Sequence, residues 1–323
     1  MQKGSDLTSS GGAPPKVGDE TPSFLTRTSK ERYPCTLTSS DLCGMAHLPD
    51  ELVDDILRQL LPIPDGVFTG ISTSTSSSYF HRHRRSCALL VCKAWCRVGT
   101  PLLYHDVLLR SQEQANALAN ALRSCPELGQ WIRKLRLEDA FSERAMHAIL
   151  GACRNVTDFC IVLNLRQRDV TIPYPALANL NPERLVVVTP ESQRRKRDRH
   201  PLLVALRRSI PKWSKLTVVL HISRCLDLDH DLLMALLRTP NLFTVILTRP
   251  FIGMRRIFWI LCSRPTIKSV IIRNSPHNQA RFDEAFRVEV SPSVRRKLHF
   301  CAVADEENYS SVAPRRSCKQ QPI

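Results

Sequence analysis

The chain has 323 residues and no apolar run near the roughly 18 to 20 residues that a membrane-spanning helix requires. Its first thirty residues also lack the apolar segment of about seven residues found in secretory signals. Three acids in that stretch, Asp6, Asp19 and Glu20, are not typical of a mitochondrial presequence. Together these absences predict a soluble, intracellular protein located in the cytoplasm, the nucleus or both.

Glycine is scarce, and eleven glycines leave few places where a backbone could cradle a phosphate. The motifs G-x-x-x-x-G-K-S/T, G-x-G-x-x-G, H-E-x-x-H and G-x-S-x-G do not occur. An acidic cluster, Asp227 to Asp231, directly precedes the helical pattern "LLMALL", where acids stabilise a helix N-terminus. We therefore expect no enzymatic activity, no catalytic residue and no cofactor.

Aromatic residues make up only 6% of the chain and are not interleaved with basic ones, which does not favour nucleic-acid binding by base stacking. The net charge is +16, and after Tyr104 there are 35 basic against 20 acidic residues. Most of this excess is dispersed, as on a solvated surface. The run "RRKRDRH" at 194–200 is compatible with a nuclear localisation signal, a phosphate-binding patch or a solvated loop.

Twelve cysteines are scattered through apolar segments, where most are expected to be small buried hydrophobes. The tightest cluster is Cys87, Cys92 and Cys96, near His81 and His83. On a helix over 87–98, Cys87 would point away from the other two, so the sequence predicts no metal site.

The first strong helix signal is "HLPDELVDDILRQLL", which follows a disordered extension predicted over residues 1–44. Pro49 suits the first helical position, and Asp50 and Glu51 complement the helix dipole. Leu48 occupies a cap position where a polar residue would serve the helix better. The helix carries one apolar stripe, formed by Leu52, Val53, Ile56, Leu57, Leu60 and Leu61.

Prolines after Leu61 predict that the helix ends there, followed by a flexible Ser-rich insert over 62–85. A second helix is expected over 86–99, ended by Thr100 and Pro101, with "TPLLYH" as a short turn. These elements form a small helical domain over 45–105. It contains too little chain to bury all of its leucines, so some apolar surface requires a partner.

The pattern then changes to short β-rich runs, predicted at 106–109, 134–138, 159–165, 184–188, 215–222, 242–247 and 267–272, separated by amphipathic helical segments. We take as equivalent Leu109, Leu135, Ile161, Val187, Val218, Ile246 and Ile271. Steps of about 25 to 31 residues predict a degenerate leucine-rich-repeat-like solenoid of β/α units over 106–301, before a disordered tail at 302–323. A doubly wound α/β domain is the alternative, but no Gly-rich loop follows any strand.

The segments "LPDELVDDILRQLL" and "LLVCKAWCRVGTPLLYHDVLLRS", followed by Gln114 to Glu138, resemble the F-box-like proteins abundant in mushroom-forming fungi. The resemblance covers about 48–139. It implies an α+β chain in which a helical F-box precedes a substrate-binding repeat domain. Such a chain is a non-catalytic subunit of an SCF-type ubiquitin ligase.

By this resemblance the F-box docks a Skp-type adaptor and, through it, a cullin scaffold, while the repeats bind an unknown protein substrate. The adaptor-facing positions would be Leu48, Pro49, Leu52, Ile56, Val91, Cys92, Trp95, Leu103 and Tyr104. The long insert and a Tyr at position 104, where many F-boxes carry Trp, depart from the family pattern. The alternative function is a basic leucine-rich scaffold without a ligase role, which binds nucleic acid or an acidic partner.

Overall fold

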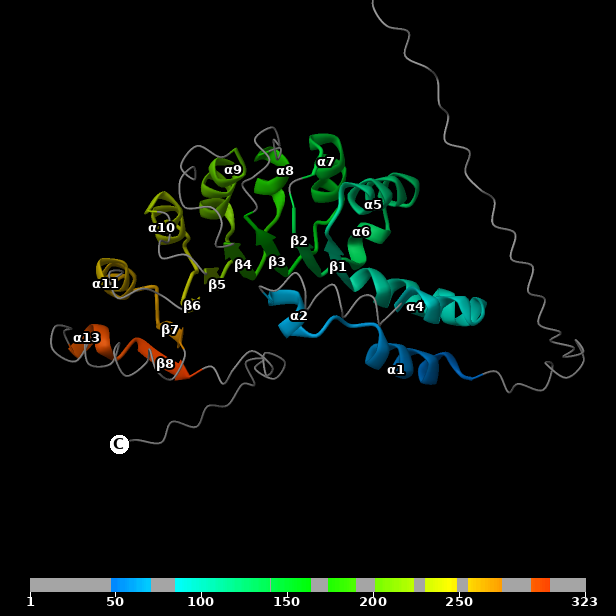
Figure 1. Ribbon diagram of the computed structural model, residues 1–323, viewed down its shortest axis with the longest axis horizontal. Coiled ribbons are helices and arrows are strands. Elements are labelled where there is room, and N and C mark those ends of the chain that lie inside the picture. The colour runs from blue at the N-terminus through cyan, green and yellow to red at the C-terminus, as the bar shows by residue number, and fades with distance from the viewer. Residues whose placement is uncertain are drawn as a thin grey trace, which may run out of the picture. The chain divides into compact units, whose positions relative to one another are not determined.

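A computed structural model describes residues 48–70, 85–139, 141–163, 174–189, 201–223, 230–248, 255–274 and 292–302. These residues belong to one compact unit of mixed helices and strands (Figure 1). The predictions for residues 1–44, for the Ser/Thr run, for 194–200, and for His81, His83, Asp227 and Asp229 lie outside the described residues. So does the predicted tail beyond Ala302.

The described helices at the N-terminal end of the unit are α1 (Asp50–Leu60), α2 (Asp65–Thr69), the 3-10 helix η2 (Arg85–Leu90) and α4 (Lys93–His105). The strands are β1 (Asp106–Leu109), β2 (Lys134–Leu137), β3 (Asp158–Val162), β4 (Arg184–Thr189), β5 (Val218–Ser223), β6 (Thr244–Thr248), β7 (Ser269–Asn274) and β8 (Leu298–Ala302). Between them lie α5 (Gln112–Ser124), α6 (Leu128–Trp131), α7 (Glu143–Ala152), α8 (Tyr174–Asn179), α9 (Pro201–Ser209), η3 (Ile210–Lys212), α10 (His230–Leu237), α11 (Arg255–Ser263) and α13 (Pro292–Arg295).

The eight strands form one sheet, are all parallel, and follow one another in sequence order from β1 to β8. A doubly wound sheet reverses its strand order at a switch point, and the described strands contain no such reversal. The seven predicted strands are present. β8 was missed, because its short run "LHFCA" alternates polar and apolar residues weakly.

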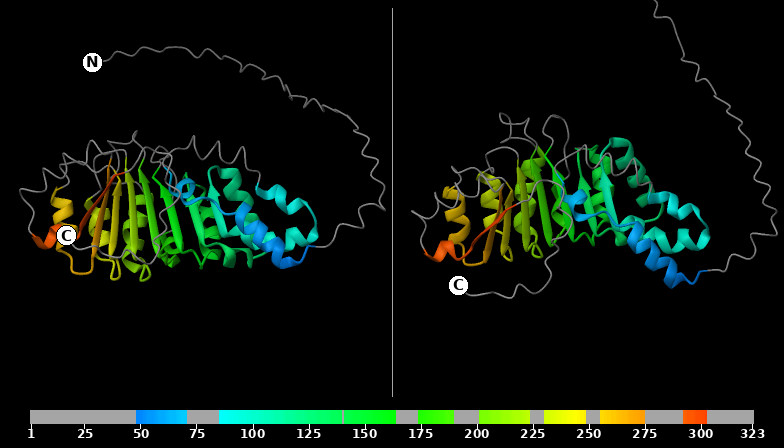
Figure 2. Two further views of the ribbon diagram at one scale, coloured as in Figure 1. Left: turned by 90° about the horizontal axis from the view of Figure 1, so that it is seen from below. Right: turned by 60° about the horizontal axis from the view of Figure 1, so that its bottom comes forward.

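The two faces of the sheet carry different apolar clusters, because alternate residues of a strand point to opposite sides. In β4, Leu185 and Val187 join the large core shared with helices α5 to α11, which lie along one side of the sheet (Figure 1). Figure 2 shows the strands side by side from the direction of α2. Val186 and Val188 point the other way and form a smaller cluster with Ile63 and Phe68 beside α2.

The turns that lead into successive strands share one hydrogen-bonding pattern. The carbonyl of Arg133 accepts bonds from the N–H groups of Thr157 and Asp158, at 2.8 and 3.0 Å. The carbonyls of Thr157, Glu183, Thr217 and Phe243 each accept two such bonds from the next turn. Each turn is therefore fixed by its predecessor.

The observed register corrects part of the predicted equivalence. Ile161 and Val187 do pair across the sheet, but Leu109 aligns with Leu137 rather than with the predicted Leu135. The equivalents in the later strands are His221, Leu247 and Ile272, not Val218, Ile246 and Ile271. The error arises because the steps between paired residues are unequal, the one from Val187 to His221 being the longest, so a nearly constant period does not determine the register.

The second predicted helix is also corrected. The helix is interrupted: η2 ends at Leu90, Val91 and Cys92 are not helical, and α4 begins at Lys93. Helix α4 then continues through Pro101 to His105, so "TPLLYH" is its last part and not a turn. Pro101 has no N–H to donate to the carbonyl of Arg97, so one helical hydrogen bond is missing there. The hydroxyl of Thr100 donates to a different carbonyl, that of Cys96, at 2.5 Å. Packing of Leu102 and Leu103 on α1 outweighs the proline's preference against helix.

Residues 62–70 of the predicted flexible insert are part of the fold. Ile63 and Phe68, at 2% and 0% exposure, pack against the face of β3, β4 and β5 that lies opposite the long helices. The prediction of a loop is wrong here because the contacts that stabilise α2 come from strands far along the chain.

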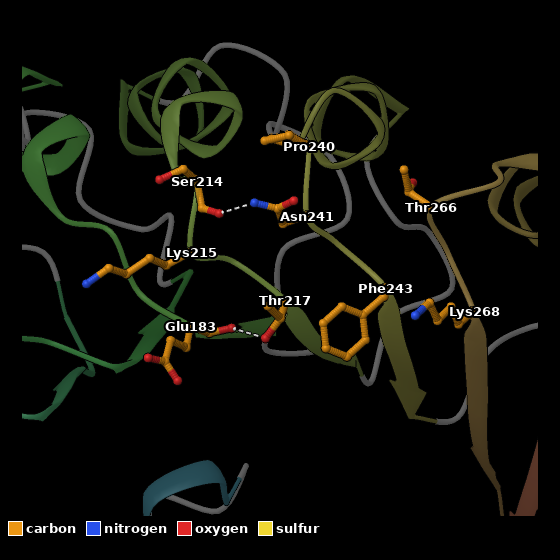
Figure 3. A pocket seen from close by; sticks show the side chains of 9 residues that line it. All are labelled: Glu183, Ser214, Lys215, Thr217, Pro240, Asn241, Phe243, Thr266 and Lys268. Atoms are coloured by element: carbon orange, nitrogen blue, oxygen red, sulfur yellow. Dashed lines mark hydrogen bonds between the residues drawn. The ribbon is translucent and has the colours of Figure 1, made fainter.

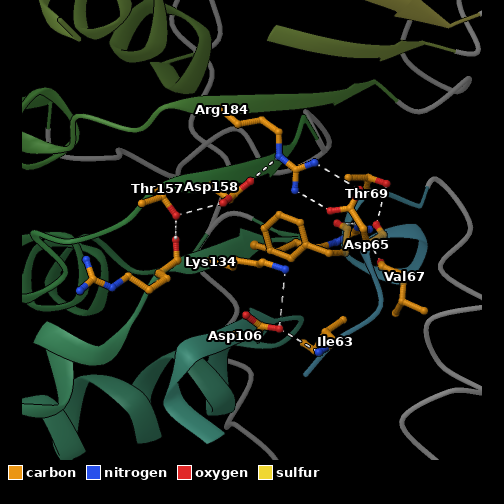
Figure 4. A network of polar contacts seen from close by, with 12 residues as sticks. Ile63, Asp65, Val67, Thr69, Asp106, Lys134, Thr157, Asp158 and Arg184 are labelled. Atoms are coloured by element: carbon orange, nitrogen blue, oxygen red, sulfur yellow. Dashed lines mark hydrogen bonds and ion pairs between the residues drawn. The ribbon is translucent and has the colours of Figure 1, made fainter. Parts of the chain in front are cut away.

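Polar contacts hold both ends of α2 to the sheet (Figure 4). At its N-terminal end, Asp65 forms an ion pair with Arg184 of β4 at 2.5 Å. At its C-terminal end the buried Arg136 of β2 donates to the carbonyls of Val67, Phe68 and Gly70, which lack helical partners. Glu138 balances the buried charge of Arg136 at 2.9 Å.

Candidate functional site

Helix α1 divides its predicted apolar stripe into two rows with different environments. Val53, Leu57 and Leu61 are buried, at 1%, 0% and 0% exposure. The second row consists of Leu48, Leu52, Ile56 and Leu60, whose exposures are 46%, 49%, 36% and 55%. Since residues four apart lie above one another on a helix, Val53, Leu57 and Leu61 form one continuous ridge, and Leu52, Ile56 and Leu60 form another. Leu48 lies just before the helix, at the same spacing in sequence. The second set is defined here as the exposed row.

The buried row is held by α4 and η2, so the direction that the exposed row faces is determined by the fold. Val53, Leu57 and Leu61 form one cluster, against which Ala88, Leu89, Trp95, Val98, Leu102 and Leu103 pack. Gly99 of α4 lies at the closest approach, where a Cβ atom would lie 3.0 Å from Leu57 Cδ1 and would collide with Leu89. Arg97 of α4 also pairs with Asp50 of α1 at 2.6 Å.

A second exposed apolar segment lies at the junction between η2 and α4. Leu90 and Val91 are 81% and 63% exposed, and Cys92 is exposed beside them. Because the helix is interrupted here, these side chains do not follow the apolar face of η2 or α4 and do not pack against the core of the helical unit. Exposed apolar residues that gather in this way are typical of a protein-interaction site.

The structure exposes six of the nine predicted adaptor-facing residues, namely Leu48, Pro49, Leu52, Ile56, Val91 and Cys92. The other three are partly buried. Trp95 and Leu103 pack against the cluster of the buried row, and Tyr104 packs against the large core of the sheet. The helix itself begins at Asp50, one residue later than predicted, so Pro49 is the capping residue and Leu48 precedes it.

Sequence reasoning omitted two exposed residues from the site. Leu60 continues the exposed row at the same spacing of four, and that spacing could have identified it. Leu90 could not be found in this way, because one continuous helix was expected over 86–99, and the break after Leu90 was not anticipated.

The exposed row has acidic surroundings. Helix α1 carries Asp50, Glu51, Asp54 and Asp55 against a single basic residue, Arg58, which pairs with Asp54 at 2.5 Å. Exposed ion pairs of this kind contribute little to stability. The exposed row is therefore bordered by an excess of negative charge.

The buried carboxyl of Asp106 connects this helical unit to the sheet. One of its oxygens accepts from the backbone N–H of Ile63 at 2.8 Å, and the other lies 2.6 Å from His105 Nδ1. Burial opposes ionisation, but the bond to His105 and the charge of Lys134 hold the pKa of Asp106 below its ordinary value.

The cysteines differ from the expectation of general burial. Cys153, Cys160 and Cys262 are buried, whereas Cys87, Cys92, Cys96 and Cys301 are exposed. The argument from one helix over 87–98 is replaced by the observed break at Cys92. Within the described ranges, no three side chains of the metal-binding types come together as a metal site.

No known protein-family model matches the chain, and no curated protein matches its sequence. In the part of the chain that the structure describes, none of the helices has the length and apolar character needed to cross a membrane.

Proposed function

We propose that this chain is a non-catalytic, substrate-recognition subunit of an SCF-type ubiquitin ligase. In this proposal the helical unit from α1 to α4 is an F-box that docks a Skp-type adaptor and, through it, a cullin scaffold. The sheet and its helices act as a degenerate leucine-rich-repeat-like solenoid that holds a protein substrate.

The observation that carries the proposal is the exposed row of α1. An amphipathic helix that docks in a groove needs apolar anchors at spacings of three or four. Leu52, Ile56 and Leu60 meet that spacing on a helix whose other row is already buried, and Leu48 extends the set just before the helix begins. Completing the burial of these half-exposed side chains would contribute about 1 kcal/mol each, which supports a stable contact.

The sequential strand order supports the solenoid part of the proposal. In a solenoid each unit contacts its neighbours in chain order, as β1 to β8 do here. The turn carbonyls that accept two bonds from the following turn repeat along the sheet in the same order. Such an array presents equivalent positions side by side, which suits the binding of an extended partner.

The attachment of α2 gives the proposal a mechanical basis. Arg136 and Arg184 connect the segment after α1 directly to β2 and β4. An adaptor bound on α1 would therefore hold the sheet in a defined orientation. In a ligase this orientation would place a substrate bound on the sheet at a constant distance from the cullin.

The test is affinity capture of the tagged full chain from a fungal lysate, followed by mass spectrometry. We expect recovery of a Skp-type adaptor and a cullin, and their loss in the variant Leu52→Asp with Ile56→Asp. The control Asn116→Asp with Asn120→Asp adds two charges to an exposed face of α5, away from the exposed row, and should retain both. Equal recovery of the adaptor with the natural chain, the double variant and the control would overturn the proposed docking surface. Capture of nucleic acid alone would favour the basic scaffold.

A further inference from the structure

A groove of about 640 Å³ lies along the edge of the sheet where β4 to β7 begin (Figure 3). Its walls come from four consecutive turns, so it runs across the repeats and not along a strand. Glu183, Thr217, Phe243 and Lys268 occupy equivalent positions in these turns, each one residue before its strand. Lys215 and Asn241, two residues before Thr217 and Phe243, line the groove above this row.

The floor of the groove is rigid, because its polar groups are paired within the chain. The carbonyl of Glu183 accepts the N–H groups of Thr217 and Val218 and also the hydroxyl of Thr217 at 3.1 Å. The amide of Asn241 donates to the carbonyl of Ser214 at 2.7 Å. A ligand would therefore be recognised by the projecting side chains, since the backbone offers few free partners.

The projecting side chains combine one aromatic ring with two ammonium groups. Phe243 is 39% exposed, and Lys268 Nζ lies 6.0 Å from the centre of its ring. Lys215 is exposed on the adjoining turn. Neither ammonium forms an ion pair with a carboxylate of the described residues. The groove thus offers two positive charges, one on either side of an exposed aromatic ring, against one carboxylate, that of Glu183.

We propose that this groove binds an extended, acidic peptide segment of a partner protein, with carboxylates on both sides of an aromatic or aliphatic side chain. The apolar side chain packs on Phe243, and the carboxylates pair with Lys215 and Lys268. Neighbouring strands lie about 4.8 Å apart, so the path from the β4 turn to the β7 turn is roughly 14 Å. About four residues of extended chain cover that length.

A peptide fits the groove better than a nucleic acid. Glu183 lies at one end of the row and would repel a phosphate backbone that follows it, whereas a peptide can place a neutral or basic residue there. The groove also contains one exposed ring, while single-strand binding uses a series of stacked bases. That the bound segment is the substrate rests on the ligase role proposed above, but the binding itself does not.

The test is a selection of random linear twelve-residue peptides, displayed on phage, against the full chain. We expect enriched peptides with at least two Asp or Glu residues around a Phe, Tyr, Trp or Leu. Their fluorescein-labelled versions are then titrated against purified variants by fluorescence anisotropy. We expect Lys215→Glu with Lys268→Glu, and separately Phe243→Ala, to weaken binding by at least about tenfold.

The matched control is Arg144→Glu with Arg154→Glu, which reverses two exposed charges outside the groove and should bind as the natural chain does. Thermal unfolding followed by circular dichroism shows that each variant is folded. Failure to enrich any peptide, or enriched peptides whose affinity ignores Lys215, Lys268 and Phe243, would overturn the proposal. So would tighter, lysine-dependent binding of a (dT)20 oligonucleotide.

The variant Leu52→Asp with Ile56→Asp separates this proposal from the ligase role. It should lose the adaptor and retain peptide binding, since α1 contributes nothing to the groove. Loss of peptide binding in that variant would contradict the inference even if the adaptor still docks.

Discussion

Arg184 of β4 and Asp65 of α2 form an ion pair at 2.5 Å across 119 residues of sequence. Arg184 also pairs with Asp158 of β3, and although burial opposes the charge, these partners raise the pKa of the guanidinium above its ordinary value. The pair connects the segment that follows the proposed docking helix to the middle of the sheet. The helical unit and the sheet therefore behave as one structure.

The buried guanidinium of Arg136 should be important for stability. In Arg136→Met, Glu138 and the carbonyls at the end of α2 lose their partner, so we expect a loss of about 3 to 5 kcal/mol in the free energy of unfolding. Urea denaturation measures it. Adding Glu138→Met to the variant removes the unpaired carboxylate and should restore part of the loss. If Arg136→Met alone is as stable as the natural chain, the contacts assigned to the end of α2 are contradicted.

Phe68 should also make a large contribution, because its side chain is fully buried beside Val186 and Leu220. Phe68→Ala leaves a cavity on that face of the sheet, and we expect a destabilisation of about 3 to 5 kcal/mol by urea denaturation. Leu90→Ala is the control, because a side chain that is 81% exposed should change stability by less than about 0.5 kcal/mol. Similar values for both variants would show that α2 does not pack on the sheet.

The thiols should differ in reactivity according to their burial. Burial raises the pKa of Cys153 to about 12 and those of Cys160 and Cys262 to about 11. These groups stay protonated and inaccessible at neutral pH, and we expect no labelling by N-ethylmaleimide in the native chain. Peptide mass spectrometry should find the label on Cys87, Cys92, Cys96 and Cys301. Rapid native labelling of Cys160 would contradict the placement of α2 over it.

Asp106 should make stability depend on pH at the acidic end. Because the pKa of its carboxyl is lower when folded, its contribution is complete above the unfolded value of about 3.9 and is lost as the pH falls through the folded value. Asp106→Asn should cost about 1.5 to 3 kcal/mol at pH 7, and the difference from the natural chain should shrink below about pH 4. Urea titrations from pH 7 to pH 3 measure this difference. A constant difference would exclude the ionised carboxylate as its source.

Local sequence patterns predicted much of the sheet, because each strand is a short apolar run set off by turn residues. They also predicted a helical segment between the first two strands, which is α5. Its N-cap Ser111 accepts the N–H of Gln114, and the side chain of Gln114 accepts the N–H of Arg110. Helix α2 could not be predicted, since its five residues have little intrinsic stability and depend on Arg136 and Arg184.

The candidate site shows the same limit. The period of α1 identified six apolar positions, but it could not separate Leu52 and Ile56 from Val53 and Leu57. Which row faces solvent depends on where α4 packs. The closest contact is between Gly99 of α4 and Leu57 of α1, which are about forty residues apart in the sequence. The packing of Tyr104 against the sheet core follows from the continuation of α4 through Pro101, which proline preferences argue against.

The central claim is that the exposed row of α1 docks a Skp-type adaptor, and calorimetric titration with a purified fungal adaptor tests it most directly. We expect saturable binding to the natural chain and to the control Asn116→Asp with Asn120→Asp. The variant Leu52→Asp with Ile56→Asp should bind at least about a hundredfold more weakly, because it places two charges in an apolar contact. Its thermal unfolding should be unchanged, since both side chains point away from the core. Equal affinity for the natural chain and this variant, or no binding to either, would contradict the claim.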